Sequence, residues 1–199
     1  MAQVFSMLRE NDLIWSAFIN NYLLGKDPPP FDLLYWNSDS TRMPAMMHGF
    51  YLREMYLNNR LIQPDALTLA GRPIDLRRIK APAYLLSARE DHIAPWRSTF
   101  AGTKLFGGPV RFVLAASGHI AGVINPPVAN KYHYWTSTRK GRTPEAWLKT
   151  AERVEGSWWP DWSAWVARKG GGKVPAREPG AGGLPVLEDA PGAYVKMRL

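Results

Sequence analysis

The chain has 199 residues, of which 46% are hydrophobic and 21% are charged, a composition typical of a folded globular protein. It contains no cysteine, which excludes disulfides, zinc–thiolate sites, iron–sulfur clusters and a cysteine nucleophile within these residues. No run of about 18 apolar residues occurs, so no transmembrane segment is expected. The net charge of +8 favours anionic partners. Because the basic residues are spread thinly, we interpret them as a solvated surface and expect no nucleic-acid binding.

The N-terminal part of the chain has the periodicity of helices. Apolar residues recur at steps of three, four and seven over residues 2–24, and we expect a break near Asp12, which would cap a second helix. Residues 31–41 form an apolar, aromatic segment that runs into a polar loop. Residues 44–59 again show overlapping apolar faces and predict another helix.

The middle of the chain predicts a strand, a helix and a strand. Residues 83–88 and 110–116 are short apolar runs bounded by polar residues or turns, which is typical of buried strands. Residues 95–106 lie between them and predict a helix that a Gly-Gly-Pro sequence ends. This order with short connections is typical of a parallel βαβ unit with a right-handed crossover, so the predicted fold class is α/β.

The C-terminal part of the chain changes in composition. Residues 144–169 predict a further helical stretch that is broken at Pro160. Residues 170–192 contain seven glycines and four prolines, which indicates an extended tail with little core of its own.

Two residues at the predicted strand ends carry the candidate chemistry. Asp91 follows the first strand and His119 follows the second, and ligands of parallel α/β sheets bind beyond these strand ends. The order acid then histidine matches that of α/β-hydrolases. A buried carboxylate would fix the imidazole tautomer, and the other ring nitrogen would deprotonate a nucleophile. Gly118 and Gly122 would allow a tight loop around His119. The alternative interpretation is that Asp91 caps a helix and His119 is a surface residue.

The remaining candidates are weaker. We interpret His92 as a structural residue and His48 and His133 as packing or surface residues, and the absence of a His-x-x-x-His pair with a carboxylate argues against a metal site. No Gly-x-Ser-x-Gly elbow occurs, and two predicted strands do not make a hydrolase sheet. A serine hydrolase complete in itself is therefore rejected, and no cofactor is expected.

Several motifs along the chain resemble those of the class I polyhydroxyalkanoate synthases. The resemblance covers essentially the whole chain in order, and its longer motifs are specific. The matching segments are residues 7–15, 20–26, 31–44, 90–96 (Glu-Asp-His-Ile-Ala-Pro-Trp), 117–127 (Ser-Gly-His-Ile-Ala-Gly-Val-Ile-Asn-Pro-Pro), 156–160 (Gly-Ser-Trp-Trp-Pro) and 190–195.

This resemblance implies an α/β-hydrolase fold with a cysteine–aspartate–histidine triad. It also implies an acyltransferase that polymerises (R)-3-hydroxyacyl-CoA into polyester and releases CoA. Asp91 and His119 match the acid and histidine motifs of the family, whereas its Gly-x-Cys-x-Gly elbow is absent from this chain. We therefore expect the chain to be a synthase fragment that is inactive alone for lack of the nucleophile.

The resemblance also sets expectations about organisation and partners. Residues 1–70 would form a helical cap-like region, residues 71–169 the C-terminal part of the hydrolase core with an incomplete sheet, and residues 170–199 the Gly/Pro-rich tail. The expected location is the cytoplasm, at the surface of polyester granules, with a homodimer or a full-length synthase as partner. The alternative is a non-catalytic module that binds granules, or that dimerises with a synthase and regulates it.

Overall fold

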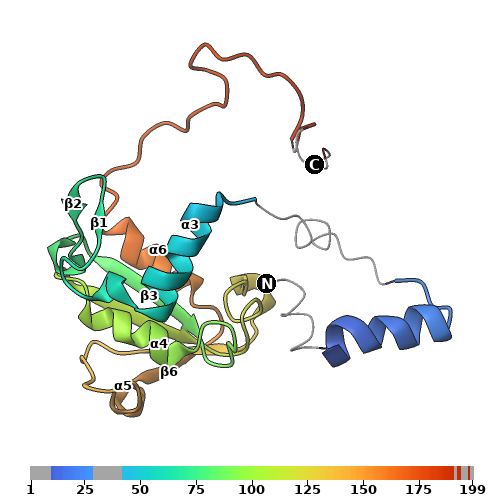
Figure 1. The fold of residues 1–199 in the computed structure, drawn as a ribbon, viewed down its shortest axis with the longest axis horizontal. Coiled ribbons are helices and arrows are strands. Elements are labelled where there is room, and N and C mark those ends of the chain that lie inside the picture. The colour runs from blue at the N-terminus through green and yellow to red at the C-terminus, as the bar shows by residue number, and fades with distance from the viewer. Residues whose placement is uncertain (1–9, 29–41, 191, 194–196, 198–199) are drawn as a thin grey trace. The chain divides into compact units, whose positions relative to one another are not determined.

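In the computed structural model, the internal contacts divide the chain into two units, Met1–Asn58 and Asn59–Leu199. Figure 1 shows the helices and strands of the chain. Among the described residues, no helix is both long enough and apolar enough to span a membrane. The structure describes residues 10–28, 42–190, 192–193 and 197.

In the first unit, one helix runs without interruption from residue 10 to residue 23. It contains two π-helical stretches, η1 (Asn11–Trp15) and η2 (Phe18–Leu23), joined by residues in right-handed helical conformation. The predicted break and cap at Asp12 are therefore wrong, because a cap residue needs a non-helical backbone and position 12 lies inside η1. The helix ends before Gly25, whose φ of 61° suits a glycine after a helix C-terminus.

The second predicted helix of this unit is confirmed. It consists of α3 (Ala45–Phe50), which starts after Pro44, and the π-helical η3 (Tyr51–Leu57). Pro44 has an extended ψ of 136°, so the chain enters the helix directly after it. The predicted aromatic segment 31–41 lies outside the described residues.

The second unit begins with a small antiparallel hairpin. Its strands are β1 (Thr68–Leu69) and β2 (Arg72–Pro73), and the two residues between them, Ala70 and Gly71, both have positive φ. Two-residue hairpin turns with positive φ at both positions match the twist of the strands. Short 3-10 helices occur elsewhere in this unit, namely η4 (Arg60–Ile62), η5 (Leu76–Arg78), η6 (Gly102–Lys104) and η7 (Pro127–Ala129).

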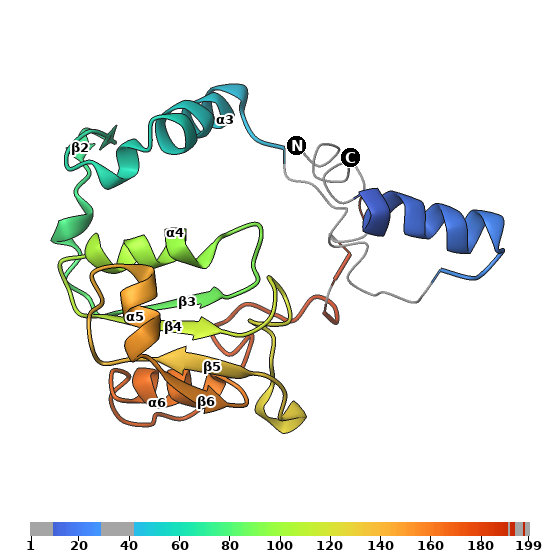
Figure 2. The ribbon, with the colours of Figure 1, turned by 90° about the horizontal axis from the view of Figure 1, so that it is seen from below.

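The main element of the second unit is a four-stranded sheet in the order β3-β4-β5-β6 (Figure 2). Strands β3 (Ala83–Ala88) and β4 (Val110–Ala115) are parallel and are connected by α4 (Trp96–Ala101), which confirms the predicted strand–helix–strand unit. Strands β5 (His133–Thr136) and β6 (Glu152–Glu155) extend the sheet by antiparallel pairing. The unit is therefore a mixed α/β structure.

The sequence interpretation missed two of these four strands. The stretch 144–169, predicted as an interrupted helix, contains α5 (Pro144–Thr150), then β6, then α6 (Trp159–Ala167). Pro160 lies in the first turn of α6, where the missing N–H of proline costs nothing, so it begins a helix instead of breaking one.

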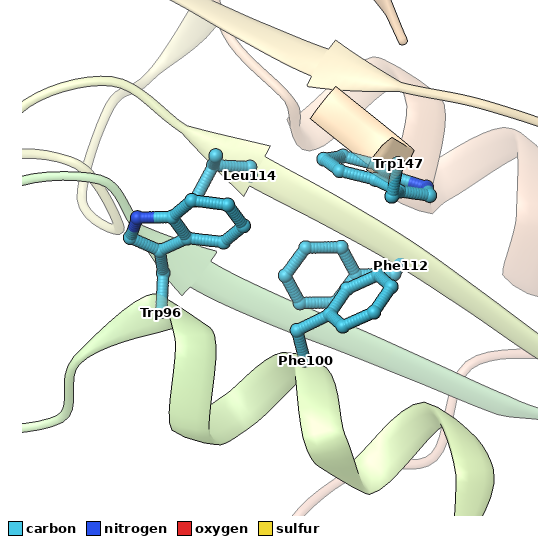
Figure 3. Packing of buried hydrophobic residues seen from close by; sticks show 5 residues of the cluster. All are labelled: Trp96, Phe100, Phe112, Leu114 and Trp147. Atoms are coloured by element: carbon cyan, nitrogen blue, oxygen red, sulfur yellow. The ribbon is translucent and has the colours of Figure 1, made fainter. Parts of the chain in front are cut away.

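An aromatic cluster fills the space between one face of the sheet and helices α4 and α5. The Phe112 ring lies 4.8 Å from the Trp147 ring and 5.2 Å from the Phe100 ring, both edge to face. Leu85 and Trp135 pack against this cluster from the neighbouring strands. Figure 3 shows the cluster with its five buried members, Trp96, Phe100, Phe112, Leu114 and Trp147.

The opposite face of the sheet carries α6. Side chains alternate between the faces of a strand, so Tyr84 and Arg111 point away from the cluster that contains Leu85. The Tyr84 hydroxyl donates to Asp161 Oδ2 at 2.8 Å, and Arg111 Nε donates to the same oxygen at 2.9 Å. The second Asp161 oxygen pairs with Arg111 Nη2. Three layers result, with the sheet between α4 and α5 on one side and α6 on the other.

The burial of β4 predicts a matched pair of mutational effects. Val113 in β4 is 0% exposed, whereas Val128 in η7 is 92% exposed. We expect Val113→Ala to lower the free energy of unfolding by about 2–3 kcal/mol, because it removes two methyl groups and leaves a cavity. Val128→Ala should change it by less than about 0.5 kcal/mol. Urea unfolding followed by circular dichroism measures both, and equal effects would contradict the described core.

Candidate active site

The loops that follow β3 and β4 bring Asp91 and His119 together. Because the two strands are parallel, both loops leave the sheet at the same edge, the one formed by the carboxyl ends of β3 and β4 (Figure 2). His119 Nδ1 lies 2.8 Å from Asp91 Oδ2, within hydrogen-bond distance. The structure thus brings together the two residues that the sequence singled out.

The Asp91 carboxylate divides its two oxygens between two tasks. Oδ1 accepts the backbone N–H groups of Ile93 and Ala94, each at 2.9 Å, at the turn that leads into α4. Oδ2 contacts His119. The interpretation of Asp91 as a helix cap is therefore wrong, because the N-cap of α4 is Pro95 and Oδ1 instead closes the turn before the helix. The expected proximity of Asp91 to His119 is confirmed.

These contacts determine the protonation state of Asp91. Its side chain is only 7% exposed, and this burial raises the pKa of the carboxyl. The N–H donors of Ala94 and Ile93 and the hydrogen bond to His119 lower it by more, so the net pKa lies below its ordinary value. The carboxylate is consequently ionised at neutral pH and lies in position to accept a hydrogen bond from His119 Nδ1.

His119 differs from its partner in its exposure. Its side chain is 48% exposed, so the imidazole stays accessible while the carboxylate beside it is buried. An imidazole oriented by a buried carboxylate and open on its other side can accept a proton from a neighbouring group and return it. The pair therefore has the geometry of a general base with its orienting acid.

Backbone contacts fasten the two loops to one another. Arg89 N–H donates to the carbonyl of Ala115 at 2.8 Å, and Glu90 N–H donates to that of Ser117 at 2.9 Å. Ser117 has a φ of 71°, a left-handed conformation that costs about 1–2 kcal/mol in a residue with a side chain. The strained backbone lies two residues before His119, at the turn that directs the loop toward Asp91.

The two glycines that flank His119 have different roles. A Cβ on Gly122 would lie 2.6 Å from the carbonyl oxygen of Ala116 and 2.8 Å from the Cβ of Ala88, so the loop approaches both strand ends too closely for a side chain. A Cβ on Gly118 would meet nothing within 4 Å. The expectation that a glycine permits the tight loop is thus confirmed for Gly122, whereas the space around Gly118 would admit a side chain.

The other three histidines differ in their surroundings. His133 is in β5, with its ring edge-on to Trp135 at 4.5 Å, and burial together with the Arg153 charge lowers its pKa. It packs within the sheet, in a strand that the sequence did not predict. His48, in α3, has an exposed side chain, in line with its interpretation as a packing or surface residue. The side chain of His92 is also exposed.

One contact at the site was not predicted from the sequence. The indole N–H groups of Trp158 and Trp159 both donate to the carbonyl oxygen of Val123, at 3.1 and 3.0 Å. Val123 belongs to the loop that carries His119. The adjacent tryptophans were a visible signal in the sequence, but their target depends on β5 and β6, which return the chain to this edge.

The two glycines allow a matched test of the loop. Gly122→Ala should lower the free energy of unfolding by about 1–3 kcal/mol, because the added methyl group would displace the backbone at both strand ends. Gly118→Ala should leave it within about 0.5 kcal/mol of the original value. Thermal and urea unfolding compare the two variants. A Gly122→Ala protein as stable as the original would show that the loop does not pack as described.

The lowered pKa of Asp91 predicts how its stabilising effect depends on pH. The folded state binds this proton less tightly than the unfolded state, so the stabilisation is complete above the ordinary pKa of 3.8 and is lost as pH falls through the lower folded value. We therefore expect the stability difference between the original protein and Asp91→Asn to shrink as the pH falls below about 4. Urea unfolding at each pH measures it, and a difference that persists unchanged into strong acid would contradict the assignment.

Comparison with known proteins identifies relatives over the whole chain. No family model matches it. It is 55% identical over 198 residues to the poly(3-hydroxyalkanoate) polymerase subunit PhaC of Rhizobium meliloti (strain 1021). This alignment covers 100% of the present chain and 32% of the relative. The subunit PhaC of Cupriavidus necator is 48% identical over 200 residues, with 100% and 34% covered. The poly(3-hydroxyalkanoate) polymerase of Methylorubrum extorquens is 51% identical over 199 residues, with 100% and 33% covered.

The chain thus spans about one third of the length of the curated relatives that it matches. The identity extends through both units and includes the segment that carries Asp91 and His119. These matches confirm the resemblance to polyhydroxyalkanoate synthases. Over its whole length, this chain is homologous to the C-terminal part of the poly(3-hydroxyalkanoate) polymerases.

Proposed function

We propose that this chain supplies the acid and the histidine of an acyltransferase that polymerises (R)-3-hydroxyacyl-CoA into polyester and releases CoA. The observation that carries the proposal is the 2.8 Å contact between His119 Nδ1 and Asp91 Oδ2 in a chain homologous to polymerases. Asp91 orients the imidazole and stabilises the imidazolium, and His119 acts as the general base.

The reaction requires a nucleophile, and none of these 199 residues is a cysteine. We propose that the thiol comes from a protein segment outside these residues, which completes a cysteine–aspartate–histidine triad. The sheet supports this arrangement, since β3 is one of its two outermost strands among the described residues and has one edge without a partner strand. An α/β-hydrolase core that continues beyond that edge would bring its nucleophile to the strand ends where Asp91 and His119 lie.

The steps then follow from acid–base chemistry. His119 Nε2 takes the proton of the thiol, and the thiolate attacks the thioester carbonyl of the substrate. The carbon–sulfur bond to CoA breaks, and CoA leaves with the proton that the imidazolium returns. His119 next takes the proton of a hydroxyl on a hydroxyacyl unit, whose oxygen attacks the acyl–enzyme thioester. The bond from the acyl carbon to the enzyme sulfur breaks as the ester of the chain forms, and the thiolate takes the proton that the imidazolium returns. General-base assistance of this kind contributes about 10²–10⁴-fold to a rate.

The expected partners and location form part of the proposal. The net charge of +8 would attract the phosphates of CoA to the protein surface. We propose that the protein acts in the cytoplasm at the surface of the polyester that it makes, in a homodimer or together with a full-length synthase.

A chimeric enzyme tests the function directly. The chain replaces the matching third of the Rhizobium meliloti polymerase, and CoA release from (R)-3-hydroxybutyryl-CoA is measured with a thiol reagent. We expect the chimera to release CoA and the chain alone to release none, because only the chimera contains a thiol nucleophile. His119→Gln in the chimera should lower kcat by at least about 10²-fold, and Asp91→Asn by about 10-fold or more. His48→Gln is the matched control and should leave kcat unchanged.

The outcomes separate the hypotheses. A chimera that keeps its activity as His119→Gln would remove the proposed base. A folded chimera that binds polyester granules without releasing CoA would favour the non-catalytic module. CoA release by the chain alone would show that the thiol is not required.

A further inference from the structure

The loop that carries His119 contacts the start of α6 through the backbone carbonyl of Val123. Both indole N–H groups of Trp158 and Trp159 donate to this single oxygen, at 3.1 and 3.0 Å. A backbone carbonyl oxygen has two lone pairs, so the two donors saturate it. The two contacts converge on one atom that lies four residues after His119.

The loop itself is a single helical turn. Gly122 N–H donates to the carbonyl of Gly118 at 2.9 Å, and Ile124 N–H donates to that of Ile120 at 2.8 Å. A turn this short leaves its last carbonyl groups without partners of its own, as every helix end does. The indoles satisfy the carbonyl of Val123, so they complete the end of the turn that begins at His119.

The two tryptophans are themselves held in place. Ser157 is buried, and its hydroxyl accepts the backbone N–H of Trp159 at 3.1 Å. Gly156, with a φ of 84°, donates to the carbonyl of Tyr132 at 2.9 Å and so ties the turn before α6 to the segment before β5. One turn into α6, Asp161 binds Tyr84 and Arg111 on the sheet. The donors therefore project from a segment that is fixed to the sheet on both sides.

The topology explains why these residues reach the site. Strand β5 is antiparallel to β4, and β6 is antiparallel to β5, so β6 runs in the same direction as β4. The chain that leaves β6 consequently emerges at the edge where the Asp91 and His119 loops lie. Trp158 and Trp159 follow the end of β6 by three and four residues.

We propose that Trp158 and Trp159 are positioning residues that hold the His119 turn through the carbonyl of Val123 and so keep His119 Nδ1 at the Asp91 carboxylate. Their consequence for catalysis rests on the proposed function, but the positioning itself does not. Two directional hydrogen bonds on one carbonyl restrain the place of the turn more sharply than apolar contact does, because burial of apolar surface is non-directional.

The test uses the full chain and tryptophan-to-phenylalanine variants, which remove the N–H donor and keep an aromatic ring. Hydrogen exchange of the amides of Gly122 and Ile124 reports opening of the turn. We expect each of Trp158→Phe and Trp159→Phe to speed this exchange about 5-fold, and the double variant on the order of 30-fold, from the typical strength of a hydrogen bond. Trp162→Phe, one turn along α6, is the matched control and should leave the exchange rate of these amides unchanged.

A second measurement separates positioning from a general loss of structure. The ¹⁵N shifts of the His119 ring at about pH 8 report which nitrogen carries the proton of the neutral imidazole. In the original protein and in Trp162→Phe, we expect the Nδ1–H form that Asp91 selects. In the double variant this population should fall, while the amides of β4 exchange as in the original protein.

The results decide the inference without reference to polymerase activity. Loop amides and a His119 tautomer that are unchanged in both single variants would overturn it, even if the chimera proves to be an active polymerase. A double variant that fails to fold leaves the two single variants to decide, since each retains one donor to Val123. Faster loop exchange with a changed tautomer would support it, even if the chimera releases no CoA.

Discussion

The parallel pairing of β3 with β4 is the constraint on which the rest of the site depends. Six consecutive pairs, from Ala83 opposite Val110 to Ala88 opposite Ala115, bring the two strand ends level. The N–H groups of Arg89 and Glu90 continue the contacts beyond the strands. An antiparallel pairing would have separated the two loops by the length of six residues, about 20 Å. The 2.8 Å contact between the acid and the histidine is therefore a consequence of strand direction.

The unequal exposure of the two side chains follows from their different tasks. Asp91 is 7% exposed and receives two backbone N–H groups on the oxygen that does not face His119. These donors compensate for burial, hold the carboxylate ionised and fix its direction. Under the proposed function, His119 exchanges protons with other molecules, and its 48% exposure leaves the ring accessible for that role. Burying the member that stays charged and exposing the member that changes charge avoids an unpaired buried charge at any step.

The elements that could be predicted from the sequence are those whose pattern of apolar and polar residues lies within one continuous segment of the chain. The apolar runs at 83–88 and 110–115 identify β3 and β4, because both strands pack against helices on their two faces. Strand β6 has four residues, three of them charged, and it packs at the edge of the sheet, so no apolar pattern marks it. The proximity of Asp91 and His119 could be predicted from the sequence, because each residue follows one of two neighbouring predicted strands and the order acid then histidine matches that of α/β-hydrolases. The contact of Trp158 and Trp159 with Val123 joins residues 35 and 36 positions apart through two unpredicted strands.

The antiparallel strands β5 and β6 bring a third segment, which contains Trp158 and Trp159, to the loops that carry Asp91 and His119. A parallel unit alone brings two loops to one edge, and each is held mainly by its own strand. The β5–β6 pair reverses the chain twice and returns it to that edge, where α6 begins. The helix is then fastened to the sheet through Asp161. Its first residues contact the histidine turn at Val123, four residues after His119. The same three-layer packing that stabilises the unit therefore also places the two indole donors that contact the turn after His119.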